Sequence, residues 1–320
     1  RDHLMLIRPH ATNFAKIRVV GIVGGGSNAI NSMIANGTIQ GVDFVSINTD
    51  AQALLLNKAD MKIQIGENLT KGLGSGGDSE IGKAAAEESV EKIKHMLEGS
   101  DMVFLTAGTG GGTGTGATAV VAQIAKDLGA LTVVVVTKPF LFEGTRRMVS
   151  AEEGIETLKD KADTLIVIPN QRILDVVDRK LSLLDAFKVA DSVLTQGVQG
   201  ISEIITLPGL INVDFADVRT IMSDAGSSLM GIGTGVGENR AQTAARAAVS
   251  SPLLEITMDG ARGELCNIVG GPDLTMSEDD EAAKLMSPPA DPYADNIFGA
   301  TNDHTTQKKI GTTAAPTGHD

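Results

Sequence analysis

The sequence predicts an α/β protein that contains a doubly wound, mostly parallel sheet, a long helix and a smaller C-terminal α/β domain. In the first half of its 320 residues, short apolar runs rich in β-branched residues alternate with helical patterns. Most of these runs are apolar at every position, which is typical of parallel strands buried on both faces. Hydrophobic residues make up 42% of the chain and aromatic residues only 3%, so we expect an aliphatic core.

The elements of the first half follow from these patterns in chain order. Strands are predicted at 17–23, 42–48, 101–107, 131–137 and 163–169, with a further short strand at 61–65. Helices are predicted at about 28–37, 79–98, 115–128 and 145–160. This alternation predicts crossover connections that place helices on both faces of one sheet.

A different pattern begins after the last of these strands. Apolar residues recur at spacings of three and four, which predicts one apolar face of a helix of some six turns. These residues are Leu183, Phe187, Ala190, Leu194, Val198, Ile201 and Ile205. Shorter strands are then predicted at 227–233, 263–269 and 295–301. The expected organisation is a tail at 1–15, a first domain at 16–180, a central helix at 181–206 and a second domain at 207–320.

The pattern weakens beyond residue 277. A helix that begins with "SEDDEAAKLM" is expected to stop before Pro288 and Pro289. The last stretch, "TTQKKIGTTAAPTGHD", has few large apolar residues, and Pro316 falls where a final strand would run. We therefore expect this end to be frayed or marginally ordered.

Charge and composition exclude several classes of function. The net charge of −13 disfavours nucleic-acid binding, which needs a basic face. The apolar run near the N-terminus is too short for a signal peptide, and "LTVVVV" is far shorter than a membrane span. The single cysteine, Cys266, cannot form an internal disulfide and is expected to be a buried structural residue. We expect a cytoplasmic protein that does not bind membranes directly.

Three glycine-rich loops follow successive predicted strands. In the first, Gly24, Gly26 and Ala29 fit G-x-G-x-x-A, and Asp50 ends the next strand. This pattern is typical of a nicotinamide dinucleotide site, but a strand-to-helix turn that needs only close packing would also produce it. Both interpretations stay open at this point.

The second loop, "TKGLGSGGDSE" (70–80), and the third, "GTGGGTGTG" (108–116), also precede helices. Loops so poor in side chains can bring backbone amides and a helix N-terminus close to an anion, and Thr113 adds a hydroxyl donor. The chain lacks the G-x-x-x-x-G-K-[ST] pattern of a P-loop. Three such loops favour a triphosphate ligand over a dinucleotide.

Several longer motifs resemble the FtsZ family of the tubulin/FtsZ superfamily, as found in bacteria and plastids. They are "NTDAQAL" (48–54), "GGGTGTG" (110–116), "TKPFLFEGTRR" (137–147), "IPN" (168–170), "GVQGISEIIT" (197–206) and "PGLINVDFADVRTIM" (208–222). The resemblance covers about residues 16–275. It implies a GTP-binding domain at 16–180 and an activation and assembly domain at 207–320. It also implies GTP or GDP as ligand, with Mg²⁺ held mainly by phosphates and water rather than by a protein metal site.

The resemblance assigns the nucleotide contacts residue by residue. The first loop would supply Gly24, Gly25, Gly26, Ser27 and Asn28, with Asn28 facing guanine, and the phosphate loop would supply Gly108, Gly111, Gly112, Thr113 and Gly114. Contacts to ribose and phosphate would come from Glu143 and Arg147. The pocket for the base would consist of Asn170, Phe187 and Asp191. Phe187 would stack on guanine and Asp191 would accept from its N1 and N2 donors. Alternatively, Phe187 is a core residue and Asp191 a solvated helix residue.

Two positions depart from the family pattern. Val23 stands where the family usually has glycine, and Thr109 replaces the usual methionine. A β-branched residue tolerates neither positive φ nor close approach of a ligand easily, so Val23 puts the path of the first loop in question.

The resemblance places hydrolysis in a different part of the chain. Asn212, Asp214 and Asp217 match the loop that reaches the nucleotide of the next subunit, where carboxylates polarise the attacking water. On spacing alone, Asp214 and Asp217 suit the N-cap and N3 positions of a helix. The two interpretations are compatible, because capping would hold the carboxylates in place.

The expected function is therefore a GTPase that polymerises head-to-tail into filaments of a cell or plastid division ring. One alternative is a relative that assembles but hardly hydrolyses, and a remote one is an NAD(P)-dependent oxidoreductase. Expected partners are further copies of the chain and the adaptor and regulator proteins of the ring. Nothing before Asp320 resembles the family's adaptor-binding tail, so no recruitment through adaptors is expected. The plastid stroma is the less favoured location.

Overall fold

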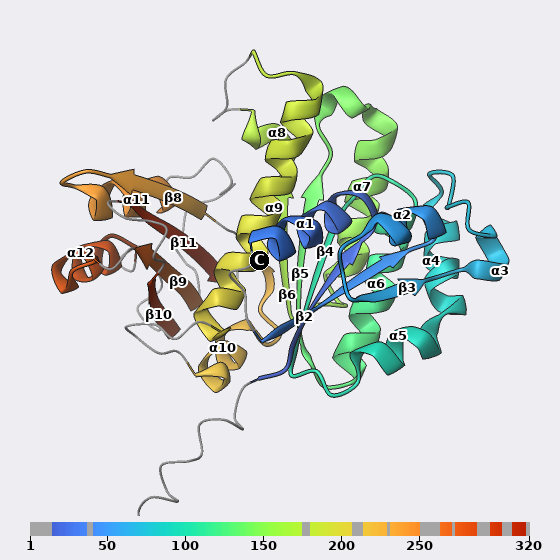
Figure 1. Cartoon of the computed structure of the whole chain (residues 1–320), viewed down its shortest axis with the longest axis horizontal. Coiled ribbons are helices and arrows are strands. Elements are labelled where there is room, and N and C mark those ends of the chain that lie inside the picture. Colours follow the sequence, from blue (N-terminus) through green and yellow to red (C-terminus); the bar gives the residue numbers. More distant parts are fainter. Residues whose placement is uncertain are drawn as a thin grey trace, which may run out of the picture.

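The computed structural model describes residues 15–36, 41–174, 180–206, 214–228, 231–249, 263–270, 273–286, 295–302 and 309–317. Two sheets form the molecule, with the long helix α9 (Leu183–Thr206) running between them (Figure 1). The larger sheet has seven parallel strands in the order β3-β2-β1-β4-β5-β6-β7. The predicted doubly wound fold with a long central helix is thus confirmed.

The strands of the larger sheet are β1 (Ile17–Ile22), β2 (Val42–Asn48), β3 (Met61–Gln64), β4 (Met102–Gly108), β5 (Leu131–Lys138), β6 (Thr164–Pro169) and β7 (Gly226–Ser228). The helices are α1 (Val23–Asn36), α2 (Ala51–Leu56), α3 (Glu67–Thr70), α4 (Ser79–Glu88), α5 (Val90–Leu97), α6 (Thr113–Asp127), α7 (Thr145–Leu158), α8 (Asn170–Ile173), α9 and α10 (Phe215–Met222), with a 3₁₀ turn η3 (Leu141–Glu143).

Both faces of this sheet are buried, because helices cover each of them. Val19 packs in a cluster with α1, α9 and α10, whereas its neighbour Val20 packs in a second cluster with α4, α5, α6 and α7. Alternate strand residues therefore face two different apolar layers, which explains why the strands are apolar at nearly every position.

The helix predicted at 79–98 is divided into α4 and α5 at Ser89. Ser89 is buried, and its hydroxyl accepts a hydrogen bond from the backbone amide of Gly66 (3.1 Å). A serine that serves a neighbouring loop in this way competes with regular helix geometry. None of the described helices is both long and apolar enough to cross a membrane.

The smaller sheet is mixed, with the order β10-β9-β11-β8. Its elements are β8 (Gly231–Val236), α11 (Arg240–Val249), β9 (Gly263–Gly270), α12 (Met276–Met286), β10 (Asp295–Asn302) and β11 (Lys309–Thr317). The strand predicted at 227–233 is divided, since β7 joins the larger sheet and β8 the smaller. Cys266 lies in β9, and its side chain is outside the described part of the chain.

A final strand forms although Pro316 was expected to disfavour one there, since β11 runs through Pro316 between β9 and β8. Pairing with β8 ends at Ala314, whereas pairing with β9 continues to Thr317. Pro316 therefore lies beyond the last residue of β11 that pairs with β8, and only the side of β11 that faces β9 is paired there. A proline is tolerated at such an edge because no amide is needed on that side.

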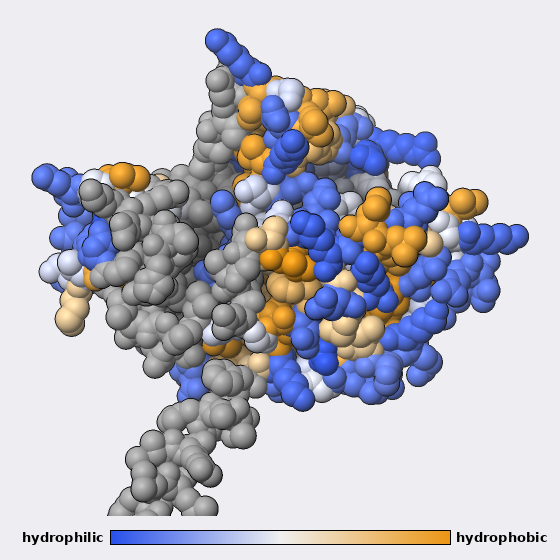
Figure 2. All heavy atoms as spheres, viewed as in Figure 1, coloured by the Kyte–Doolittle hydropathy of each residue, from blue (hydrophilic) through white to orange (hydrophobic). Residues whose placement is uncertain are grey.

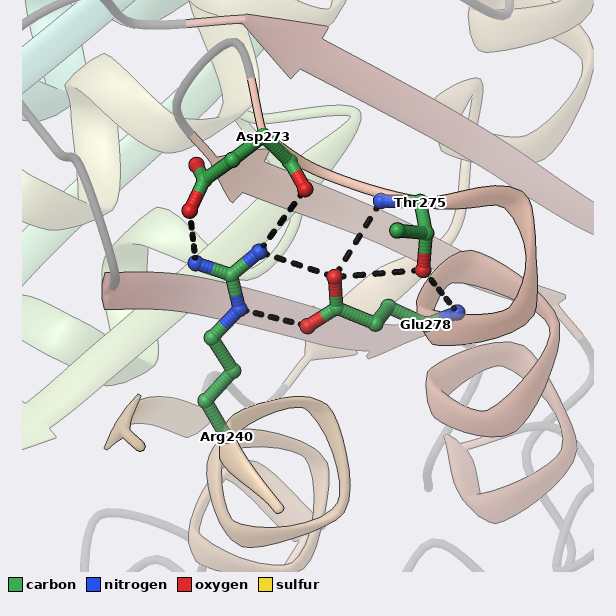
Figure 3. Close-up of polar contacts among 4 residues, drawn as sticks. All are labelled: Arg240, Asp273, Thr275 and Glu278. Atoms are coloured by element: carbon green, nitrogen blue, oxygen red, sulfur yellow. Dashed lines mark hydrogen bonds and ion pairs between the residues drawn. The ribbon is translucent and has the colours of Figure 1, made fainter. Parts of the chain in front are cut away.

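Helices α11 and α12 of the smaller domain are joined by a buried arginine (Figure 3). Arg240 donates to the carboxylate of Glu278 through Nε and Nη2, and to the carboxylate of Asp273 through Nη1 (2.9 Å). Thr275 and Glu278 form a reciprocal capping box at the start of α12. The arginine raises the stability of the carboxylate form and lowers the pKa of Glu278.

Candidate functional site

The larger sheet has a topological switch point between β1 and β4. The chain proceeds from β1 to β2 and β3 on one side, and from β4 to β5, β6 and β7 on the other. The loops that follow β1 and β4 therefore diverge, and ligands of open α/β sheets bind at such points. A cavity of about 330 Å³ lies here, at the carboxyl ends of the strands.

Most of the nucleotide-binding residues expected from the sequence line this one cavity. They are Gly24, Gly25, Gly108, Gly111, Gly112, Thr113, Gly114, Glu143, Arg147, Asn170, Phe187 and Asp191. Gly26, Ser27 and Asn28 do not line it. Residues from five separate loops and helices, spread over most of the first domain's length, thus meet at the switch point.

The phosphate loop connects β4 to α6, with Gly112 at the N-cap position. The first amides of α6 have no acceptor within the helix, so they can serve a ligand. A Cβ on Gly112 would overlap the hydroxyl oxygen of Ser75, and one on Gly114 would lie 2.6 Å from the carbonyl oxygen of Gly108. Glycine is required at these two positions by packing as well as by the approach of a ligand.

The second glycine-rich loop lies behind the phosphate loop rather than in the cavity lining. Thr113 donates to Ser75 Oγ (3.2 Å), and the Thr113 and Thr49 hydroxyl oxygens are also 3.2 Å apart. All three hydroxyls are buried. The loop at 70–80 therefore supports the phosphate loop from outside, which the sequence did not distinguish from direct ligand contact.

The first loop contains the least regular backbone of the site. Val23 has φ of 53°, and Gly24 departs from helical geometry with φ of 32° and ψ of −112°. Positive φ is a genuine outlier for a β-branched residue. Gly26 faces away from the cavity, where an added Cβ would overlap the carbonyl oxygen of Thr106.

The two polar side chains that α8 and α9 bring to the cavity, Asn170 and Asp191, differ in their hydrogen bonding. Asn28 Nδ2 donates to Asp191 Oδ2 (2.9 Å), which orients that carboxylate. Burial raises the pKa of Asp191, and the hydrogen bond from Asn28 opposes this effect. Asn170 Oδ1 is buried and accepts no hydrogen bond from any described residue. A buried unpaired acceptor at a cavity wall is suited to a donor on a ligand.

Phe187 belongs to the core and also borders the cavity, so the two interpretations of this residue are compatible. Its ring packs against the apolar cluster beneath the sheet and also lines the cavity. Asp191, one turn further along α9, lines the same cavity and is therefore not merely a solvated helix residue.

Glu143 and Arg147 form an ion pair at the opposite wall. Arg147 Nη1 donates to Glu143 Oε1 (2.8 Å), and the backbone amide of Phe140 donates to Glu143 Oε2 (2.8 Å). The Glu143 side chain is only 10% exposed, whereas that of Arg147 is 54% exposed. The carboxylate is therefore fixed, and the guanidinium stays accessible to an anion.

Sequence reasoning missed five cavity residues, of which four lie at or just after the carboxyl ends of β1, β4 and β5 and the fifth lies on α9. They are Ile22, Thr109 as a lining residue, Thr137, Pro139 and Ala190. Thr109 Oγ1 donates to the carbonyl oxygen of Thr137 (2.6 Å), because Gly108 and Thr137 are direct partners in β4 and β5. Their position at the carboxyl ends of adjacent parallel strands was the available signal.

The nicotinamide interpretation of the first loop has no support at Asp50. This residue caps α2, with Oδ1 accepting from the amides of Gln52 (2.9 Å) and Ala53 (3.3 Å). Asp50 does not line the cavity, so its carboxylate is not placed for a ribose there.

Asp214 and Asp217 lie at the other edge of the sheet. Arg219 of α10 donates to the carbonyl oxygens of Asp101 (3.2 Å), directly before β4, and of Gly129 (3.5 Å), two residues before β5. At the end of α10, the carbonyl oxygen of Met222 accepts from Thr164, the first residue of β6. The 24-residue α9 that separates the two regions is about 36 Å long.

The two carboxylates take the predicted helix positions without the predicted capping bond. Asp214 is the N-cap residue of α10, and Asp217 is the third helical residue. The Asp214 side chain makes no capping hydrogen bond, and both residues are exposed. The expectation that capping holds the Asp214 carboxylate was therefore wrong. Asn212 lies outside the described residues.

Comparison with known proteins identifies the family of this chain. Residues 16–178 match the GTPase domain of the tubulin/FtsZ family, and residues 226–320 match the C-terminal domain of the FtsZ family. A structure titled as an empty FtsZ dimer from M. jannaschii is 48% identical, with a TM-score of 0.95 over 99% of this chain and 92% of that one. A GTPγS-bound protofilament of CetZ2 from Haloferax volcanii is 20% identical, with a TM-score of 0.80 over 94% of this chain and 92% of that one, and shows a shared fold. The chain belongs to the tubulin/FtsZ family of GTPases and, within it, to the FtsZ family.

Proposed function

We propose that this chain binds GTP and GDP at the switch-point cavity and hydrolyses GTP when subunits stack head-to-tail into filaments. The observation that carries the proposal is the separation of two sets of residues. The cavity lies at the carboxyl edge of the sheet, and the exposed carboxylates of α10 lie at its amino edge. One subunit therefore holds both halves of a site that it cannot close on itself.

The cavity residues fit a guanine nucleotide. The carboxylate of Asp191 is complementary to the N1–H and 2-amino donors of guanine, which adenine lacks. Asn170 Oδ1 offers a further buried acceptor. Unpaired buried acceptors would oppose the binding of the wrong base, which favours GTP over ATP.

The phosphate end is poor in positive side chains. Among the described residues that line the cavity, Arg147 is the one Lys or Arg. Within the described ranges, no cluster of His, Cys, Asp or Glu could hold a metal ion. Mg²⁺, held mainly by phosphates and water, would supply the remaining charge neutralisation during phosphoryl transfer. The chain itself contributes the amides of α6, whereas the Thr113 hydroxyl donates to Ser75 and holds the phosphate loop in place.

Asp214 and Asp217 are proposed to orient the attacking water in the cavity of the adjacent subunit. Both carboxylates are exposed, and the one on Asp214 is not engaged in capping α10. Arg219 holds α10 against the loops that precede β4 and β5, which leaves its N-terminus at the surface. Asn212 is assigned to the same segment by its place in the sequence alone.

Exposed apolar side chains support assembly through the carboxyl edge. Apart from Val236 and Met276, every large hydrophobic residue exposed in the described part of the chain follows the carboxyl end of β2, β3, β5 or β6. Leu55 and Leu56 of α2 are 79% and 84% exposed, and Figure 2 shows apolar surface over α2 and the start of α9. Such surface typically marks a protein–protein contact, and a further copy of the chain is the proposed occupant.

The dependence of hydrolysis on protein concentration tests this proposal. The GTPase rate per subunit should rise steeply above a threshold concentration, because two subunits are needed to complete one site. Asp217→Asn should bind GTP normally and hydrolyse it poorly. Glu152→Gln, which changes an exposed carboxylate on α7, is the matched control and should behave like the wild type. A specific activity that stays constant down to nanomolar protein would overturn the shared site.

A second candidate is nucleotide-dependent assembly with little hydrolysis. It is favoured by the strained backbone at Val23, which lines the cavity directly beside the phosphate loop. GTP-dependent sedimentation without release of phosphate would select this candidate. In either case, the proposed setting is a division ring in the cytoplasm, with the plastid stroma as the less favoured alternative, together with the adaptor and regulator proteins of that ring.

A further inference from the structure

Three phenylalanine rings meet at the base end of the cavity. Phe140 and Phe142 stack almost parallel, with centroids 4.9 Å apart and an interplanar angle of 12°. Phe187 meets both rings nearly at right angles, with centroids 5.6 Å from Phe140 and 5.9 Å from Phe142. Such stacked and edge-to-face pairs are favourable beyond the area that they bury.

The three rings differ in their exposure. Phe140 is fully buried, Phe187 lines the cavity, and Phe142 is 52% exposed without lining the cavity. The core therefore explains Phe140, and the proposed base contact explains Phe187. Neither explains why a large aromatic side chain at position 142 remains half in water.

The contacts of Phe142 define what it can do. The stacked pair presents two perpendicular contacts to Phe187, so a rotation of the Phe187 ring would disturb both contacts at once. Phe187 belongs to the second turn of α9, where the preceding Leu183 and Leu184 are 59% and 64% exposed and provide little confinement. Phe142 is thus the outer member of the pair that fixes the plane of the Phe187 ring.

The same loop also holds the ribose side of the cavity. The amide of Phe140 donates to Glu143, whose carboxylate pairs with Arg147. The segment 140–143 therefore contacts the Glu143–Arg147 wall through its backbone and the base wall through its rings. A ligand that engages Glu143 restrains the segment that carries Phe142.

We infer that Phe142 is a positioning residue, which sets the orientation of Phe187 for stacking on the nucleotide base without touching the nucleotide. This inference rests on the proposed binding of guanine nucleotides. It predicts that Phe142 contributes to the affinity for a base and not to the affinity for phosphate groups alone.

The test compares two ligands at protein concentrations too low for assembly. Dissociation constants for GDP and inorganic tripolyphosphate would be measured by competition for wild type, Phe142→Ala, Phe142→Tyr and Leu141→Ala. Leu141 is the matched control, because it is an apolar neighbour that is 65% exposed and takes part in none of the three ring contacts.

Phe142→Ala should weaken GDP binding by about 3- to 10-fold and leave tripolyphosphate binding unchanged. Phe142→Tyr should restore GDP binding, and Leu141→Ala should leave both affinities unchanged. Equal weakening of both ligands, or no change in GDP binding, would overturn the inference. Failure of the wild type to bind GDP would instead overturn the proposed function.

Discussion

Val23 offers a direct test of the backbone that leads into the nucleotide cavity. It is a partly buried β-branched residue with φ of 53°, packed against the apolar cluster on the α6 side of the sheet. Replacing it by glycine and by alanine separates the effect of the backbone from that of the side chain. Both variants lose most of the isopropyl packing, but only glycine removes the strain.

The expected difference follows from three magnitudes. An alanine in the left-handed region is strained by about 1–2 kcal/mol, whereas glycine is not. Glycine loses about 0.5–1 kcal/mol more conformational entropy on folding than alanine. Val23→Gly should therefore be more stable than Val23→Ala by up to about 1.5 kcal/mol. In an ordinary helix or strand the order would be reversed, with alanine more stable by about 0.5–1 kcal/mol.

The assay is thermal or urea unfolding of the nucleotide-free proteins, followed by circular dichroism. A difference of 1 kcal/mol corresponds to a shift of about 2–4 °C in a domain of 150–250 residues. A stability order with alanine above glycine would refute positive φ at position 23. Because Val23 lines the cavity, GTP affinity should be measured alongside, with Val23→Gly expected to bind at least as tightly as the wild type.

Three further predictions concern charge and packing. Burial raises the pKa of Asp191, so folding destabilises its carboxylate. At pH 7 the nucleotide-free Asp191→Asn variant should therefore be at least as stable as the wild type, and it should lose the selectivity for GTP over ATP. In the wild type, protonation of Asp191 should weaken GTP binding as the pH falls. Because the pKa of Asp191 is raised, this loss should begin at a higher pH than it would for an ordinary aspartate, and calorimetric titration would measure it. Arg240→Ala should cost about 1–3 kcal/mol in the free energy of unfolding, because it removes a buried guanidinium and leaves the partly buried Glu278 carboxylate without its donor. The pKa of Glu278 is lowered by Arg240, so the ion pair stabilises the fold fully above about pH 4.5, and this stabilisation is lost as the pH falls through the lowered pKa. Urea unfolding should therefore show that acid lowers the stability of Arg240→Ala much less than that of the wild type. Gly111→Ala should weaken GTP binding without changing the stability of the fold, because an added Cβ meets open space in the cavity lining. Gly112→Ala should lower both the GTP affinity and the stability, because its Cβ would overlap the loop at 70–80.

The strands of the larger sheet were predictable because they are buried on both faces. Val19 and Val20 point into opposite apolar layers, and this environment leaves a continuous β-branched run in the sequence. The four-residue spacing of Phe187 and Asp191 likewise placed both on one face of α9. These features depend on local pattern and were recovered from it.

Other features depend on contacts that a local pattern does not encode. The break between α4 and α5 follows from one buried hydroxyl of Ser89 bonded to Gly66. The strand at Pro316 is possible because β8 is shorter than β9 at that end, which only the pairing register shows. The support of the phosphate loop by Ser75 depends on a contact with Thr113, which lies 38 residues further along the chain.

The candidate site was predicted better by family motifs than by physical pattern. Glycine-rich loops alone left a nicotinamide site open at Asp50, and the capping of α2 by that residue became visible only in the structure. The aromatic contacts of Phe142 were not predicted, because nothing in "PFLFEG" indicates that two of its rings stack beside α9.

The central claim is that one subunit supplies the nucleotide cavity and its neighbour supplies the carboxylates of α10. Mixing two defective variants tests it most directly. Asp191→Ala should lose GTP binding but keep an intact α10, whereas Asp217→Asn should bind GTP but lack the carboxylate. A double variant carrying both changes serves as the control partner.

Phosphate release would be measured for each variant alone and for their equimolar mixture above the assembly threshold. The mixture should hydrolyse GTP faster than the sum of its components, because the cavity of Asp217→Asn meets the intact α10 of Asp191→Ala. Replacing Asp191→Ala by the double variant should abolish this gain. A mixture no more active than the sum would contradict a site shared between subunits.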